Sequence, residues 1–273
     1  MKRTCSMALF VCITGAMTVA AAAANTPARP HQALIDKMIA AARVAPAKPE
    51  GPVIKLHVRE EETTSDGVAH KRSYTAWINP ASILQRRLQL NASVVIGFDG
   101  HRGWATIRGQ EDKRPQTPMM AAGTLNNKLF AELLPFSLQE PGVEITSVRT
   151  TTWRKKRALK LQLAFARNFF TSPIMNTAWS VIVDARTFHV LVAQFLPPKK
   201  YLAIAAEGMR YEFLKHTTAA GLRLPVSVVI IALQGEQGVE SGHTAVDHVT
   251  VTTQPYDPTL FLSPKELKRI NEG

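Results

Sequence analysis

Cysteine is nearly missing from this chain of 273 residues, and its two cysteines, Cys5 and Cys12, lie within the first 24 residues. If those residues are removed, the remaining chain has neither a disulfide bond nor a thiol nucleophile. Many small secreted domains depend on disulfides, but a chain of this length can bury a core that folds without them. Because Asn25 is not a cysteine, a lipid-anchored precursor cleaved at that point is also excluded.

Long hydrophobic runs are also missing, since a comfortable membrane span needs about 20 apolar residues. The apolar run at residues 7–19 follows Lys2 and Arg3 and precedes the alanines of residues 20–24. A basic start, a short apolar run and an A-x-A cleavage site are typical of a secretory signal peptide. We therefore predict that residues 1–24 are a cleaved signal peptide, that residues 25–273 form a single domain, and that the protein works in a bacterial periplasm.

The sequence contains no recognisable catalytic motif. It has no GxxxxGK[ST] or GxGxxG phosphate loop, no HExxH and no GxSxG, since the serine in residues 238–242 comes one position too late. His243 and Asp247 would share a face of a strand, whereas His248 would point away, and two ligands do not complete a metal site. We predict that these side chains and the acidic residues 60–62 are solvated, and that the protein has no metal, no cofactor and no catalytic residue.

Positive charge exceeds negative charge, with 33 Lys and Arg residues against 21 Asp and Glu residues. The leader holds two of the basic residues and no acidic one, so residues 25–273 carry a net charge of +10. After export, nucleic acid is not an expected partner; anionic lipid head groups, an acidic protein surface, or plain solubility account for the charge. The densest basic run, Arg154, Lys155, Lys156 and Arg157, is predicted to be a solvated hairpin loop, with contact to an anionic membrane surface as the alternative.

Hydrophobic periodicity predicts a mainly β protein with a few helices. Helical spacing occurs at residues 31–45, in an apolar segment that opens at Thr117–Pro118, and at residues 264–271. Strands are predicted from Val53 and at residues 73–79, 83–90, 94–98, 103–108, 143–152, 158–166, 178–184, 188–195, 209–216, 225–233 and 245–253. Short links such as Asp99-Gly100 indicate an antiparallel meander, and the lack of strand–helix–strand alternation excludes a doubly wound parallel sheet.

The central apolar segment interrupts the run of strands and places Leu125, Leu129, Leu133 and Phe136 at helical spacing. Each aromatic residue of the strands, taken alone, is accounted for by an ordinary core. Together, a curved sheet with an apolar concave face under a movable helix would form a pocket for an acyl chain, with methionines as adaptable lining. The predicted ligand-binding residues are Tyr74, Phe98, Trp104, Leu129, Phe130, Leu133, Trp179, Tyr211 and Phe213.

Several short segments share, in order, the pattern of a known family. They are the N-terminal helix, Asp99-Gly100 through Gly103-Trp104, the apolar helix 125–134, and residues 179–187 (WSVIVDART), 208–211 (GMRY), 221–225 (GLRLP) and 257–261 (DPTLF). In this pattern, which covers most of residues 25–273, the chain resembles the outer-membrane lipoprotein-sorting family. The strand that ends in Asp-x-x-Thr and is followed by a second strand is its most specific part.

The resemblance implies a strongly curved antiparallel sheet that forms an incomplete barrel, with an N-terminal helix and a central helical plug on its open side. It also implies binding of acyl chains or other hydrophobic ligands in the periplasm. The family's fold is shared by lipoprotein carriers and by an envelope-stress regulator. This chain is longer than the dedicated carriers, and the resemblance assigns a role to no individual residue.

Three functions remain open from the sequence. The leading hypothesis is a carrier that holds a lipid or an acylated lipoprotein without covalent chemistry. The second is an envelope sensor or scaffold that binds a protein partner through the same fold. The third is a hydrolase that uses scattered His and Asp residues such as His243 and Asp247.

Overall fold

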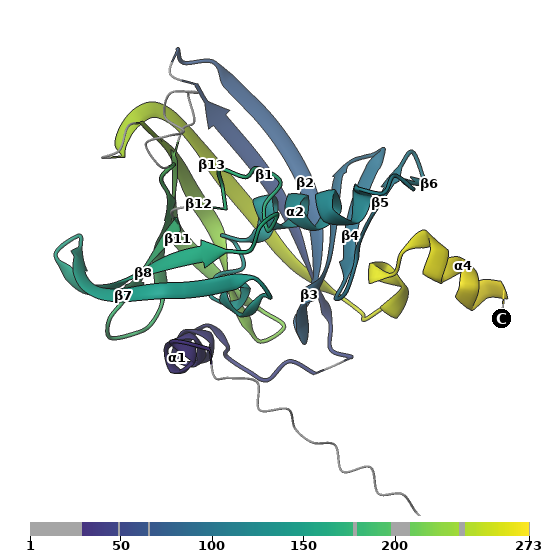
Figure 1. Ribbon diagram of the computed structural model, residues 1–273, viewed down its shortest axis with the longest axis horizontal. Coiled ribbons are helices and arrows are strands. Elements are labelled where there is room, and N and C mark those ends of the chain that lie inside the picture. The colour runs from purple at the N-terminus through teal and green to yellow at the C-terminus, as the bar shows by residue number, and fades with distance from the viewer. Residues whose placement is uncertain are drawn as a thin grey trace, which may run out of the picture.

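The computed structural model describes residues 29–48, 50–64, 66–176, 179–197, 208–234 and 238–272, so the predicted signal peptide lies outside the described residues. Thirteen strands among them form one antiparallel sheet (Figure 1). The first six are β1 (Val53–Thr63), β2 (Ala69–Asn79), β3 (Ser82–Asn91), β4 (Val94–Asp99), β5 (Gly103–Ile107) and β6 (Gln110–Glu111). The others are β7 (Val143–Trp153), β8 (Lys156–Phe165), β9 (Trp179–Asp184), β10 (Val190–Phe195), β11 (Gly208–Ala219), β12 (Leu222–Gln234) and β13 (Val239–Gln254).

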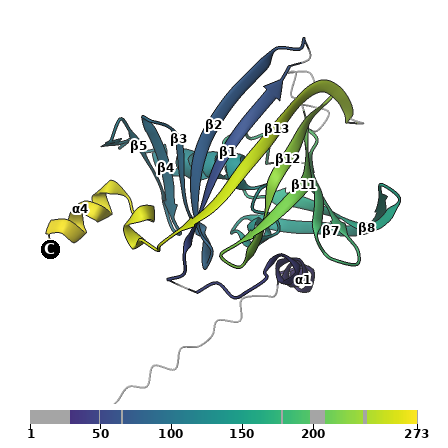
Figure 2. The same ribbon diagram turned by 180° about the vertical axis from the view of Figure 1, so that it is seen from behind.

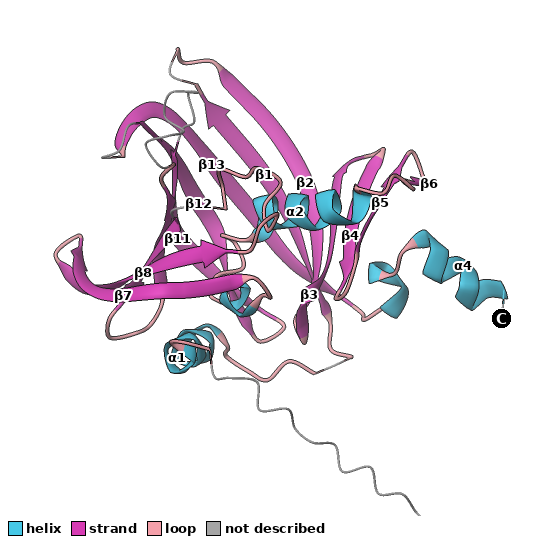
Figure 3. Ribbon diagram, in the orientation of Figure 1, coloured by secondary structure: helices cyan, strands magenta, loops and turns pink. Residues whose placement is uncertain are grey.

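The sheet is strongly curved and remains open. Its strand order is β6-β5-β4-β3-β2-β1-β13-β12-β11-β10-β9-β8-β7, so β6 and β7 are its two edges. Two meanders, β1–β6 and β7–β12, therefore meet at β13, which pairs with β1 on one side and with β12 on the other. The predicted incomplete barrel of antiparallel strands is confirmed (Figure 3).

The turns form where polar side chains can bond to the backbone. In the β4–β5 hairpin the Asp99 carboxylate accepts hydrogen bonds from the backbone N–H groups of His101 (2.6 Å) and Arg102 (2.7 Å). Gly100 has φ +105°, a left-handed conformation that glycine adopts without steric cost. Asp184 caps the β9–β10 turn in the same way, accepting from the backbone of Thr187 at 2.8 Å. Both turns match the sequence prediction.

Helix α1 (Gln32–Ala42) packs against the main hydrophobic core through Ile35, Met38 and Ile39. The backbone N–H of Val44 donates to the carbonyl of Gly221 at 2.8 Å, which ties the end of α1 to the β11–β12 turn. In Figures 1 and 2 the helix lies beneath the sheet, near that turn.

Helix α2 (Thr117–Leu129) crosses the concave side of the sheet and contacts β4 and β5 (Figure 1). The apolar spacing continues to Phe136, but the helix ends at Leu129 and the 3-10 helix η1 (Phe136–Gln139) follows. Pro135 lacks an N–H group and disfavours helical backbone in the residue before it, so the chain turns. The typical N-cap role of threonine, which the Thr117–Pro118 pair suggests, is not realised here, because Thr117 is the first helical residue and Gln116 precedes it without a side-chain cap.

A buried polar group attaches α2 to the sheet. Arg86 on β3 is 2% exposed and donates to both carboxylate oxygens of Glu140, at 2.9 and 3.0 Å. Its Nη2 also donates to Oδ1 of Asn126 on α2 at 3.0 Å. We call these three residues the buried latch. It joins the sheet, the helix and the segment after η1 at one point.

Helix α4 (Pro264–Glu272) follows the short 3-10 helix η2 (Pro258–Phe261) and extends away from the sheet (Figure 2). Ser263 and Glu266 form a capping box at its start. The Glu266 carboxylate accepts from the backbone N–H of Ser263 at 2.8 Å, and the Glu266 N–H donates to Oγ of Ser263 at 3.3 Å. None of the residues of α4 is buried. In the described part of the chain, no helix combines the length and apolar character that crossing a bilayer requires.

Candidate functional site

A cleft of about 340 Å³ opens on the concave side of the sheet, beside the C-terminal end of α2. We call it the central cleft. It is lined by Glu60, Glu62, Tyr74, Asn127, Lys128, Glu132, Met175, Met209, Tyr211, Ile230, Ala232, Ala245 and Asp247. Strands β1, β2, β11, β12 and β13 supply most of these residues. Side chains at paired positions of neighbouring strands lie side by side on the same face of the sheet, so several strands contribute to one cleft.

Packed aromatic rings support one wall of the central cleft. Tyr211 stacks on Trp179 with ring centroids 5.9 Å apart, and Trp179 stacks in turn on Phe170 at 5.5 Å. Phe130 meets Trp179 edge-on at 5.5 Å. Such ring contacts have preferred geometries and stabilise the rings in addition to apolar burial. They therefore hold Tyr211 in a defined position at this wall.

Carboxylic acids form the other notable part of the lining. Glu60 and Asp247 are directly opposite each other in the β1–β13 register. Glu132, in the turn after α2, is 5% exposed and reaches the same cleft. Like charges placed opposite each other on a sheet are destabilising, so this arrangement is not one that stability favours.

The protonation of these acids follows from their surroundings. Burial, with the neighbouring Asp247 carboxylate as the next cause, raises the pKa of Glu132 to about 8. Burial and then Glu60 raise the pKa of Asp247 to about 7. Burial and the nearby acids also raise the pKa of the Tyr211 hydroxyl. At neutral pH the cleft therefore holds carboxyl groups that are poised to gain or lose a proton.

Basic side chains are present but unevenly distributed. Lys128 Nζ lies 3.3 Å from Oε2 of Glu60, and Arg72 lies 3.8 Å from Oε1 of the same carboxylate. Within the described parts of the chain, no ion pair joins a basic side chain to Glu132 or Asp247. The acids of the cleft are thus only partly neutralised.

Two predictions about solvated acids were wrong. Asp247 is 2% exposed instead of solvated, because β13 lies in the middle of the sheet and turns this side chain to the covered concave side. Glu60 is largely buried at the cleft, since β1 extends past it to Thr63 before the turn. The side chain of His243, which was considered together with Asp247, lies outside the described residues. Among those residues, no group of three or more His, Asp, Glu or Cys side chains could hold a metal ion.

The structure brings some of the predicted ligand-binding residues together and separates others. Tyr74 and Tyr211 line the central cleft, and Phe130 and Trp179 lie behind its wall. The other five predicted residues do not line the central cleft. Leu129 and Leu133 are fully buried in the main core, and Phe98 and Phe213 are half-buried against it. Trp104 lies at a different cleft.

Sequence reasoning missed the polar residues of the cleft. Glu60, Lys128 and Glu132 were not proposed as site residues, because charged residues are mostly exposed. Asp247 was named only in the hydrolase alternative and was predicted to be solvated. The signal that could have identified Asp247 is its position between Val246 and Val249 in a predicted strand.

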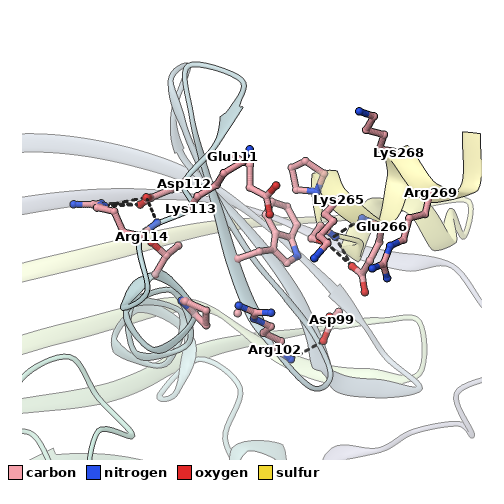
Figure 4. Close-up of a pocket in the computed structure, with 16 residues that line it drawn as sticks. Asp99, Arg102, Glu111, Asp112, Lys113, Arg114, Lys265, Glu266, Lys268 and Arg269 are labelled. Carbon is pink, nitrogen blue, oxygen red and sulfur yellow. Dashed lines mark hydrogen bonds and ion pairs between the residues drawn. The ribbon is translucent and has the colours of Figure 1, made fainter. Parts of the chain in front are cut away.

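A second, larger cleft of about 700 Å³ lies between β5, the start of α2 and helix α4 (Figure 4). Trp104 forms part of its lining and donates its indole N–H to the carbonyl of Phe261 at 2.9 Å. The Arg114 guanidinium beside Asp112 holds the pKa of that carboxyl well below its usual range. This cleft is polar and exposed, whereas the central cleft combines an apolar wall with buried acids.

The basic run occupies the β7–β8 hairpin, as predicted. Arg154 and Lys155 both have positive φ values, and all four basic residues are exposed. Arg154 pairs with Glu212 at 2.5 Å and lies over the ring of Trp153. Part of the positive charge of the hairpin is therefore already matched within the chain.

Comparisons with known proteins identify the class of fold. No protein-family model and no curated protein sequence matches this chain. Among solved structures, it is similar to a LolA superfamily protein from Nitrosomonas europaea, with TM-score 0.54 and 10% identity over 86% of this chain and 98% of the other. It is also similar to an outer membrane lipoprotein-sorting protein domain from Vibrio parahaemolyticus, with TM-score 0.50 and 9% identity over 88% and 96%. The chain therefore has the fold of the lipoprotein-sorting proteins, which confirms the resemblance at the level of fold.

Proposed function

We propose that the protein is a periplasmic carrier that binds a hydrophobic ligand, either a lipid or an acylated lipoprotein, in the central cleft and performs no covalent chemistry on it. The observation that carries the proposal is the cleft itself. It lies on the concave side of an open half-barrel, at the end of the helix that crosses this side.

The size and walls of the cleft suit such a ligand. Its 340 Å³ is within the range of about 300–1,000 Å³ that small-molecule sites occupy. Met175 and Met209 lie among its lining residues and can adapt to chains of different shape. Since each buried CH₂ group contributes about 0.8 kcal/mol, a chain of several carbons binds without a metal or a catalytic group.

The periplasmic location is part of the proposal and rests on the sequence. The first 24 residues have the order of a signal peptide, and the cysteine-free remainder needs no disulfide chemistry after export. N-terminal sequencing of the protein recovered from its host's periplasm should begin at Asn25. A mature protein that begins at Met1 would contradict this part.

Filling the cleft tests the binding function directly. Ala232→Phe places a ring in the cleft, and we expect it to abolish binding of a fluorescent fatty acid and to remove co-purified lipid seen by native mass spectrometry. Ala81→Phe is the matched control, because Ala81 is exposed in the β2–β3 turn. Both variants are first compared with the wild type by circular dichroism.

The carrier proposal fails if the wild-type protein binds no fluorescent fatty acid and carries no lipid. It also fails if Ala232→Phe, while folded, binds as well as Ala81→Phe. Retrieval of a protein partner by crosslinking, unaffected by Ala232→Phe, would favour a sensor or scaffold instead.

A further inference from the structure

Asp247 is the most unusual group in the central cleft. Its side chain is 2% exposed, lines the cleft, and has an Oδ1 atom with no hydrogen-bond partner among the described residues. A buried polar atom left without a partner costs free energy, and an unpaired buried carboxylate costs more than a neutral group. Glu60 lies opposite it and increases that cost. This cost is recovered if a ligand supplies the missing partner.

We propose that the central cleft selects ligands whose apolar chain carries a cationic group, such as the ammonium of an aminolipid head group, and that Asp247 and Glu132 bind this cation. The inference rests on the proposed carrier function and names the class of its ligand. Asp247 lies outside every segment of the family pattern, whereas Glu132 lies within the segment 125–134.

The rest of the lining suits an organic cation better than a metal ion. Among the described residues no set of acids is arranged for metal binding, and most of the cleft wall is apolar or aromatic. Tyrosine rings attract cations placed over their faces. The ring of Tyr74 already lies 5.3 Å from Nζ of Lys128, which shows that a cation is accommodated there.

The basic side chains at the cleft pair with Glu60 and Glu62, and among the described residues neither forms an ion pair with Glu132 or Asp247. Lys128 is bound to Glu60, at 3.3 Å, and Arg72 approaches Glu60 and Glu62 from the rim. Glu132 and Asp247 therefore remain for the ligand. A bound ammonium would form charge-assisted hydrogen bonds with them, which are stronger than neutral ones.

This arrangement makes binding depend on pH. The ionisable groups that face the cleft are Glu60 and Glu62 of β1, Arg72 and Tyr74 of β2, Lys128 of α2, Glu132 of the following turn, Tyr211 of β11 and Asp247 of β13. Burial keeps Glu132 and Asp247 partly protonated near neutral pH, and only their ionised forms attract a cation. Affinity for a cationic ligand should therefore rise from pH 6 to pH 8.5, and affinity for a neutral ligand should not.

The test compares three probes with the same twelve-carbon chain: dodecylammonium, dodecanol and dodecanoate. Each is kept below its micelle or solubility limit, and binding is measured by isothermal titration calorimetry. We expect the cation to bind the wild-type protein about 10-fold or more tightly than the alcohol. Dodecanoate should bind most weakly, because its carboxylate would meet Asp247 and Glu132.

Matched variants locate the effect. Asp247→Asn and Glu132→Gln keep the shape of each side chain and remove its charge, so each should lower affinity for the cation by about 10-fold and leave dodecanol binding unchanged. Glu61→Gln is the control, because Glu61 is exposed and pairs with Lys71 at the surface. It should change neither affinity.

The outcomes separate this inference from the carrier function. If all three probes bind equally, or if dodecanoate binds best, the cationic selectivity is wrong and the carrier function stands. If Asp247→Asn binds the cation as the wild type does, the assignment of Asp247 is overturned. If no probe binds, the carrier function fails, and this inference fails with it.

Discussion

Arg86 illustrates how a single residue can hold distant segments of this fold together. Its guanidinium is buried on β3 and donates to Glu140 and Asn126. Burial raises the pKa of Glu140, and the adjacent Arg86 opposes that shift. Neither charge is favourable alone in this position, so each one requires the other.

Breaking the buried latch should therefore be costly. Arg86→Met leaves the Glu140 carboxylate buried without its partner and should lower the free energy of unfolding by about 3–5 kcal/mol. Urea unfolding measures this, with the exposed Arg149→Met as the control. The double variant Arg86→Met, Glu140→Leu should recover part of the loss; a double variant as unstable as the single one would contradict the explanation.

The acids of the central cleft predict how stability changes with pH. Their folded-state pKa values, about 8 for Glu132 and about 7 for Asp247, are raised above the ordinary values of 4.5 and 3.8. A carboxyl with a raised pKa favours folding below its unfolded pKa and loses this contribution as pH rises through its folded pKa. The free energy of unfolding should therefore fall between about pH 4 and pH 8, and Asp247→Asn with Glu132→Gln should flatten this dependence.

Urea unfolding of both proteins across this pH range provides the measurement. The pair Asp36→Asn, Glu144→Gln is the control, since both acids are exposed, and it should keep the wild-type slope. Equal slopes for all three proteins would show that the cleft acids do not titrate as described.

The sequence predicts the apolar residues of the site better than the polar ones. Tyr74 and Tyr211 are identifiable because aromatic residues at alternate positions of a strand face a core. Asp247 is not, because a charged residue is expected at the surface unless its partners are known. The β1–β13 pairing that buries it joins residues nearly two hundred positions apart, and no local pattern specifies that pairing.

At the scale of elements, α2 depends on a glycine in its middle. A Cβ atom at Gly123 would lie 2.9 Å from the backbone nitrogen of Thr171 and 3.2 Å from the carbonyl carbon of Phe170. The helix thus contacts the segment after β8 at backbone distance. Intrinsic helix propensity disfavours glycine, so packing must determine this choice.

Gly123→Ala distinguishes these two effects by sign. Propensity alone would stabilise the protein by about 1 kcal/mol. Because the added methyl meets backbone atoms, we expect a loss of about 1–3 kcal/mol, measured by thermal or urea unfolding. Thr124→Ala on the same helix is the control and should have little effect; a stabilised Gly123→Ala protein would show that the segment can move aside.

The elements themselves were largely predictable. Period-two alternation and turn residues place most strands within a few residues of their observed bounds, as in β4 and β9. The start of β13 was placed six residues too late, and β6 was not predicted. The end of α2 was less predictable, because Leu133 and Phe136 continue the helical spacing after the helix has ended. The turn and η1 bury those side chains instead. Hydrophobic periodicity does not distinguish a continued α-helix from a turn followed by a short 3-10 helix.

At the scale of the molecule, one continuous sheet and one main core connect nearly all elements. We therefore expect the proposed single domain, residues 25–273, to unfold in one cooperative transition. Far-ultraviolet circular dichroism and tryptophan fluorescence should give coincident curves, because Trp77, Trp104, Trp153 and Trp179 lie on strands in both meanders. Two separated transitions would show that the meanders are independent units.

The position of β13 has a consequence for how the chain matures. This strand is the last in chain order, yet it lies between the two meanders and supplies the only pairing that joins β1 to β12 among the described residues. A nascent polypeptide stopped before Val239 would possess two unattached half-sheets, each with a bare inner edge. Assembly of the whole sheet must therefore wait until synthesis has passed this segment.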